Sequence, residues 1–70
     1  MDIADYLKLP YTIKLKPYPN GSYYVEIVEL PGCMSEGDSL EEALLMIEDA
    51  KLAWLRVAIE AKYPIPLPIN

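Results

Sequence analysis

The stretch Glu29-Leu30-Pro31-Gly32-Cys33-Met34-Ser35-Glu36-Gly37-Asp38-Ser39-Leu40-Glu41-Glu42-Ala43 decides how this chain folds. Two pairs of turn-forming residues, Pro31-Gly32 and Gly37-Asp38, divide it into a strand end, a short strand and a helix start. We assign both glycines to turn positions with positive φ. Ser39 is a good helix N-cap, and Glu42 follows three residues later, as in a capping box. The stretch therefore predicts an α+β domain.

Two segments with alternating apolar residues precede this stretch. Residues 11–16 carry apolar side chains at every second position, which is the pattern of a half-buried strand. Residues 22–28 alternate in the same way, and a turn that contains Asn20-Gly21 joins the two segments. We therefore expect an antiparallel hairpin, with residues 33–36 as a short third strand.

Residues 40–62 contain no Gly or Pro and predict one long helix of about 35 Å. Strands of six or seven residues reach only about 20–23 Å, so part of the helix should extend beyond the sheet. We expect the stem of Lys51 to lie along apolar surface with its amine in water. One apolar stripe of the helix should pack on the sheet: Leu40, Ala43, Leu44, Ile47, Ala50, Trp54, Val57, Ala58 and Ala61.

A second apolar stripe makes this helix apolar over an arc of roughly 260°, whereas a surface helix needs only about 100° or somewhat more. One explanation is that residues 2–8, which could form a helical turn capped by Asp2, cover this stripe with Tyr6 and Leu7. We favour a second copy of the chain as the cover, in a dimer or tetramer. The stripe consists of Leu45, Leu52, Leu55 and Ile59.

The C-terminal segment 63–70 alternates Pro64, Pro66 and Pro68 with apolar residues. In a strand, these prolines would remove N–H donors from one edge only, which suits an edge strand that pairs on its other side. A polyproline II tail is the alternative. As a strand, the segment would add Ile65 and Leu67 to the oligomer interface.

Composition excludes several classes of function. Seventy residues form one small domain, 1–70, that should be only marginally stable as a monomer. The net charge of −5 argues against nucleic acid and favours a basic protein partner. Without histidine, the single Cys33 makes neither a zinc site nor a Cys–His dyad, and no apolar run reaches the ~18 residues of a membrane span. We expect a cytoplasmic protein with no membrane association, metal or cofactor.

The quoted stretch resembles the HicB family of small antitoxins. The hallmark of that family is E-L-P-G-C, here Glu29–Cys33, followed by G-D-(S/T)-L-E-E-A, here Gly37–Ala43. The resemblance extends from Tyr6 to Pro68. It implies a β-β-β-α-β order in a partial ribonuclease H-like fold: three antiparallel strands (11–36), one long helix (39–62) and a C-terminal edge strand, after an N-terminal segment (1–10).

The resemblance also implies a function. HicB proteins bind and mask HicA-type toxins, which are small basic ribonucleases that cleave mRNA. Many family members carry a C-terminal DNA-binding domain, whereas this chain ends at Asn70, so we expect no direct DNA binding by this chain alone. The alternative is a stand-alone oligomeric protein of HicB fold that has no toxin partner.

Ribonuclease H enzymes bind Mg²⁺ through clustered carboxylates, and this chain offers a poor match. The central strands carry only two acidic residues, and the acids at the helix start are favoured by the helix dipole without any metal. Lysines on the outer face of the hairpin should form a cross-strand ion pair with Glu26. We therefore predict that the chain is not an enzyme. Candidate partner contacts around the hallmark turn are Glu26, Glu29, Glu36 and Asp38.

Overall fold

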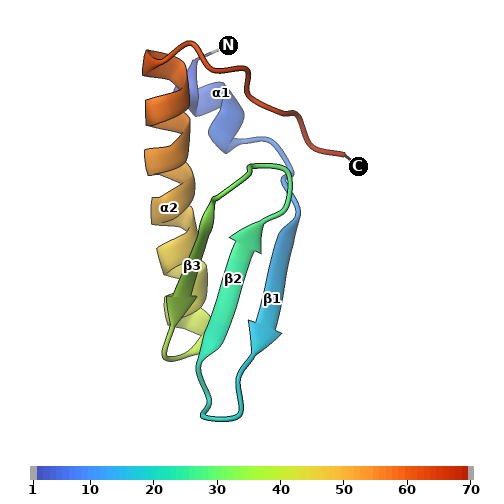
Figure 1. The fold of residues 1–70 in the computed structure, drawn as a ribbon, viewed down its shortest axis with the longest axis vertical. Coiled ribbons are helices and arrows are strands. Elements are labelled where there is room, and N and C mark those ends of the chain that lie inside the picture. The colour runs from blue at the N-terminus through green and yellow to red at the C-terminus, as the bar shows by residue number, and fades with distance from the viewer. Residues whose placement is uncertain (1, 70) are drawn as a thin grey trace.

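Two antiparallel pairings build a three-stranded sheet of order β1-β2-β3 (Figure 1). The structure, a computed structural model, describes residues 2–69. Its strands are β1 (Ile13–Pro17), β2 (Tyr23–Ile27) and β3 (Met34–Gly37). Lys14 lies opposite Glu26, and their side chains form the expected ion pair, with 3.9 Å between Nζ and Oε1. The predicted hairpin and short third strand are thereby confirmed.

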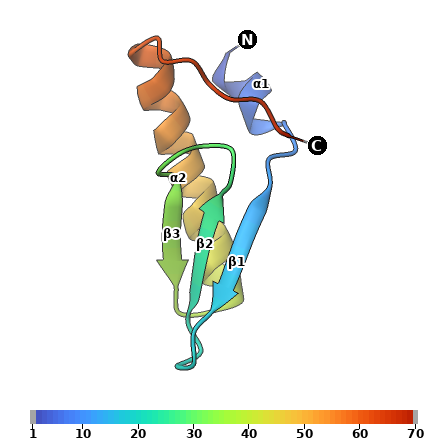
Figure 2. The same ribbon diagram turned by 45° about the vertical axis from the view of Figure 1, so that its right-hand side comes forward.

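The long helix α2 (Leu40–Glu60) covers one face of this sheet, over β2 and β3 (Figures 1 and 2). Its C-terminal half extends past the end of the sheet, as its length predicted. There the short helix α1 (Ile3–Leu7) packs against it, and Asp2 caps α1 as expected. The fully enclosed core between sheet and helix consists of Val25, Ile27, Leu30, Cys33, Ala43, Ile47 and Leu55.

The start of α2 shows which parts of the predicted capping box form. The Ser39 hydroxyl accepts a hydrogen bond from the Glu42 N–H at 3.1 Å, as predicted. The Glu42 carboxylate, however, accepts from the Asp38 N–H at 3.2 Å rather than from Ser39. Two backbone donors at the helix N-terminus are thereby satisfied by side chains, which stabilises the turn from β3 into α2.

The two glycines of the hallmark stretch serve different purposes. Gly32 has φ +82°, so its predicted positive φ is confirmed. For Gly37 that prediction is wrong, because its φ is not positive. A Cβ at Gly37 would lie 2.7 Å from the Cα of Ala43, closer than real Cβ atoms approach their neighbours. Gly37 is therefore required by the close approach of α2 to β3.

The buried face of α2 is rotated relative to the predicted stripe. Val57, which was expected to face the sheet, is 66% exposed. Leu55, which was assigned to the oligomer interface, is fully buried in the core. Tyr6 and Leu7 of α1 pack against the same core from the side of the second stripe. The N-terminal segment thus covers part of the second apolar stripe. This is one of the two covers that the sequence suggests, the other being a second copy of the chain.

The end of α2 fixes where the tail begins. Lys62 has φ +55°, and the N–H groups of Lys62 and Tyr63 donate to the carbonyls of Ile59 and Ala58. These two hydrogen bonds form a Schellman motif with lysine at the position that glycine usually takes. The predicted final strand is not found among residues 63–69. The tail instead crosses toward the start of β1, where side chains satisfy its backbone (Figure 2).

Candidate partner-binding site

Glu29, one of four predicted partner contacts, is engaged within the chain. Its carboxylate accepts hydrogen bonds from the Thr12 N–H at 2.9 Å, the Thr12 hydroxyl at 2.8 Å and the Ile69 N–H at 3.2 Å. Burial acts to raise the pKa of Glu29, but these hydrogen bonds outweigh it and hold the pKa below its usual value. Glu29 therefore joins β1 to the tail, and the structure removes it from the set of surface contacts.

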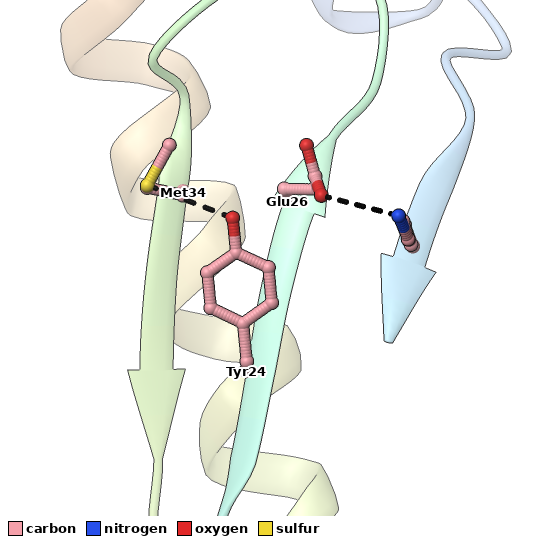
Figure 3. A network of polar contacts seen from close by, with 4 residues as sticks. Tyr24, Glu26 and Met34 are labelled. Atoms are coloured by element: carbon pink, nitrogen blue, oxygen red, sulfur yellow. Dashed lines mark hydrogen bonds and ion pairs between the residues drawn. The ribbon is translucent and has the colours of Figure 1, made fainter. Parts of the chain in front are cut away.

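Glu26 and Glu36 come together on the outer face of the sheet, away from α2. Tyr24 lies opposite Glu36 in the register of β2 and β3, and Glu26 lies opposite Met34. The Tyr24 hydroxyl contacts the Met34 sulfur at 3.6 Å (Figure 3). Partial burial and then the Glu26 carboxylate raise the pKa of Tyr24, so its hydroxyl remains a hydrogen-bond donor at neutral pH. This face carries two carboxylates around one aromatic ring, and β1 adds Lys14, paired with Glu26, and Lys16, opposite Tyr24.

Asp38 is exposed at the turn between β3 and α2. It lies at the opposite end of β3 from the Pro31-Gly32 turn, so the four predicted acids do not form one cluster. Glu26 and Glu36 lie near each other, Asp38 lies beyond the end of β3, and Glu29 binds the backbone of the tail.

An apolar groove lies between the Pro31-Gly32 turn, here called the hallmark turn, and the second half of α2. The sequence did not predict this groove. The groove holds about 530 Å³. Trp54, predicted for the core, is half-buried in its wall, and its Nε1–H donates to the Pro31 carbonyl at 2.8 Å. The Tyr63 ring meets the Trp54 ring edge-on, with 6.0 Å between centroids. A usable sequence signal was the series of small residues on this flank of the helix: Ala50, Ala53, Ala58 and Ala61.

The predicted interface residues differ in exposure. Leu45 is 72% exposed and Leu67 is 59% exposed, so both are available to a second copy. Ile59 is 39% exposed, and Leu52 and Ile65 are half-buried. The Lys51 side chain is mostly buried, as expected for its stem, and its amine contacts the carboxylate of the exposed Glu48 at 3.2 Å.

The chemistry available to the described residues is limited. Between residues 2 and 69, no three Cys, Asp or Glu side chains come together in a way that could hold a metal ion. Burial raises the pKa of the Cys33 thiol, which keeps it protonated and unreactive. In the same part of the chain, neither helix has the length and apolarity that a bilayer crossing requires.

Comparison with known proteins gives the family of the chain. Antitoxin HicB 1 of Photorhabdus laumondii is 36% identical over 58 residues, which are 83% of this chain and 37% of that protein. Antitoxin HicB of Escherichia coli K12 is 34% identical over 58 residues, which are 83% of this chain and 42% of that protein. This chain thus spans about two fifths of the length of these antitoxins.

A shorter relative is matched over more of its length. A UPF0150 protein of Synechocystis is 34% identical over 56 residues, which are 80% of this chain and 71% of that protein. The family of HicB-like antitoxins of bacterial toxin–antitoxin systems matches residues 11–70. Since that match covers the sheet, the long helix and the groove between them, the chain belongs to the HicB-like antitoxin family.

Proposed function

We propose that this chain is an antitoxin that binds and masks a small, basic, mRNA-cleaving toxin of the HicA type. The observation that carries the proposal is the family match over residues 11–70. The net charge of −5 supports a basic partner, because complementary charge speeds encounter and disfavours wrong partners. The chain acts in the cytoplasm, by occlusion and without catalysis of its own.

Carboxylates on the sheet are the candidate polar contacts for this toxin; Glu36 and Asp38 are exposed, and Glu26 is half-buried and paired with Lys14. Glu26 and Glu36 flank Tyr24 on the outer face, and Asp38 follows at the end of β3. Glu29 contributes indirectly, by holding the tail against β1. Partner contacts of this kind should set the association rate and its salt dependence more than the lifetime of the complex.

The assembled form is a homo-oligomer, a dimer or tetramer, in which Leu45, Ile59 and Leu67 contribute exposed apolar surface. In that assembly the tail, with Ile65 and Leu67, exchanges the contacts that it makes with Tyr11 and Glu29 in the single chain for pairing with the sheet as the final edge strand. The strand and helix order then matches the partial ribonuclease H-like fold that the family resemblance implies. The net charge of −5 disfavours direct contact with DNA.

The test is co-expression with the small basic protein encoded beside the gene. That protein alone should stop growth, and co-expression of this chain should restore growth and give a complex on gel filtration. Buffers with and without Mg²⁺ serve as controls for nuclease activity of the purified chain. Absence of both growth rescue and complex would contradict the proposal, and RNA cleavage by the purified chain would show it to be an enzyme.

A second candidate function is a stand-alone oligomeric HicB-fold binding protein with no toxin partner. It is favoured by the Synechocystis relative, of which the chain covers 71% and which is named only as a UPF0150 protein. An oligomer that forms without any co-purifying basic protein in the native host would support this candidate over the antitoxin.

A further inference from the structure

The groove beside the hallmark turn is built from contacts that fix its shape. The hydrogen bond from Trp54 to the Pro31 carbonyl holds the turn against α2, and the edge-on contact with Tyr63 supports the other side of the indole ring. Val57 lines the groove and is 66% exposed, and Met34, at the start of β3, is 51% exposed. A preformed apolar groove with such exposed side chains favours an occupant.

β3 leaves backbone hydrogen-bonding groups unused beside this groove. The Cys33 carbonyl accepts a hydrogen bond from the Ile27 N–H at 3.0 Å, so this carbonyl faces β2. Because backbone direction alternates along a strand, the N–H and C=O groups of Met34 and Glu36 point away from the sheet. β3 is an edge of the sheet formed by residues 2–69. A strand added there would place alternate side chains toward the groove.

The charges around the groove discriminate between possible occupants. Glu36 is exposed on β3, on the outer face of the sheet, and Asp49 is exposed on α2, one turn before the groove residue Ala53. Arg56 and Glu60 together line a separate hollow beside α1, and Lys62 lies between the groove residues Ala61 and Tyr63, so the rim keeps an acidic excess. A second copy of this chain, itself of charge −5, would bring like charges together, whereas a basic segment would neutralise them.

We propose that the groove and the unpaired edge of β3 together bind one extended, basic segment of the toxin. The segment adds a strand beside β3, inserts apolar side chains between the hallmark turn and Val57, and pairs its basic side chains with Glu36 and Asp49. The partner's identity rests on the proposed function; the position and the mode of binding rest on the groove and the strand edge.

A charge placed in the groove tests the position. Val57→Arg should weaken binding of the neighbouring basic protein by at least about tenfold, because it opposes basic side chains in an apolar site. The matched control is Ala4→Arg, which adds the same residue at an exposed position of α1, on the other flank of α2. It should change the dissociation constant by less than about twofold. Calorimetric titration measures both, and circular dichroism checks that each variant folds.

A proline on β3 tests the mode of binding. Glu36→Pro removes an N–H that points away from β2 and is a substitution that edge strands tolerate. Glu36→Gln removes the same charge but keeps the N–H. We expect Glu36→Pro to bind several-fold more weakly than Glu36→Gln.

A photocrosslinker locates the bound segment directly, without relying on a variant that binds more weakly. With p-benzoylphenylalanine in place of Val57, the chain should crosslink to the toxin; with the same group in place of Ala4, it should not. If the wild-type chain binds no neighbouring protein, the proposed function and this inference both fail. If the wild-type chain binds and all variants bind equally well, the proposed function stands and the groove assignment is overturned. Crosslinks from position 57 to a second copy would also overturn it.

Discussion

Gly37 lies where β3 ends, and its lack of a side chain allows α2 to start directly against the sheet. A Cβ there would be 2.7 Å from the Cα of Ala43, which is itself fully buried. These are backbone atoms, so no rotamer change could relieve the overlap. Glycine is therefore required at this position by packing, whereas at Gly21 it is required by a φ of +92° with open space around it.

These two positions give a matched stability test. Gly37→Ala should lower the free energy of unfolding by about 3 kcal/mol, at the upper end of the usual range for overpacking. Gly21→Ala should lower it by about 1 kcal/mol, because only the left-handed backbone conformation is penalised. Urea denaturation of both variants measures the difference. Equal losses would contradict the packing role of Gly37.

At the scale of single elements, the end of α2 contains one strained residue, Lys62, whose substitution should stabilise the fold. Lys62 is in the left-handed conformation that closes the Schellman motif. Lys62→Gly should raise the free energy of unfolding by about 0.5–1 kcal/mol, since relief of strain exceeds the added flexibility of the unfolded chain. Lys62→Ala, which keeps the strain and removes the charge, is the control. A gain from Lys62→Ala as large as that from Lys62→Gly would assign the effect to charge.

The tail depends on the charge of Glu29. Hydrogen bonds from Thr12 and Ile69 favour the ionised carboxylate, so its pKa is lower in the folded chain than the ordinary value of 4.5. The resulting stabilisation is complete above about pH 4.5 and is lost as the pH falls through the folded pKa. Wild type should therefore be more stable than Glu29→Gln at pH 7, and this advantage should shrink toward pH 3. Thermal unfolding across that range measures it, and a pH-independent difference would contradict the clamp.

The outcome for each element shows what the sequence can predict. The strands and α2 follow from local patterns, namely alternation in 11–16 and 22–28 and the cap at Ser39, and the structure confirms them. The tail could not be predicted in the same way, because its path depends on distant side chains such as Tyr11, whose hydroxyl donates to the Pro66 carbonyl at 2.7 Å. The role of Glu29 was missed for the same reason, since its partners are 17 and 40 residues away.

For the whole molecule, apolar surface remains on two flanks of α2, which suits two different contacts. The groove beside β3 is the contact that we propose for the toxin. Leu45 on α2 and Leu67 on the tail are the exposed apolar residues that we propose for self-association. The sequence indicated the surplus apolar surface. It did not show which residues lie on each flank, because that depends on the orientation of α2, which buries Leu55.

Self-association can be tested without disturbing the core. Leu45→Glu combined with Leu67→Glu should convert dimers or tetramers into monomers with little change in monomer stability, because both side chains are more than half exposed. Leu55→Glu should instead unfold the chain, since it buries a charge in the core. Sedimentation velocity at micromolar concentration gives the oligomeric state. A monomeric wild-type chain would contradict the assigned interface.

Inhibition of the toxin by the purified chain tests the central claim most directly. The neighbouring basic protein is incubated with mRNA while the chain is added in increasing amounts at several salt concentrations. We predict that cleavage stops at a fixed stoichiometry, and that association slows as salt rises while dissociation changes little, because long-range attraction is screened within about 8 Å at physiological ionic strength. Undiminished cleavage in the presence of excess folded chain would contradict the account.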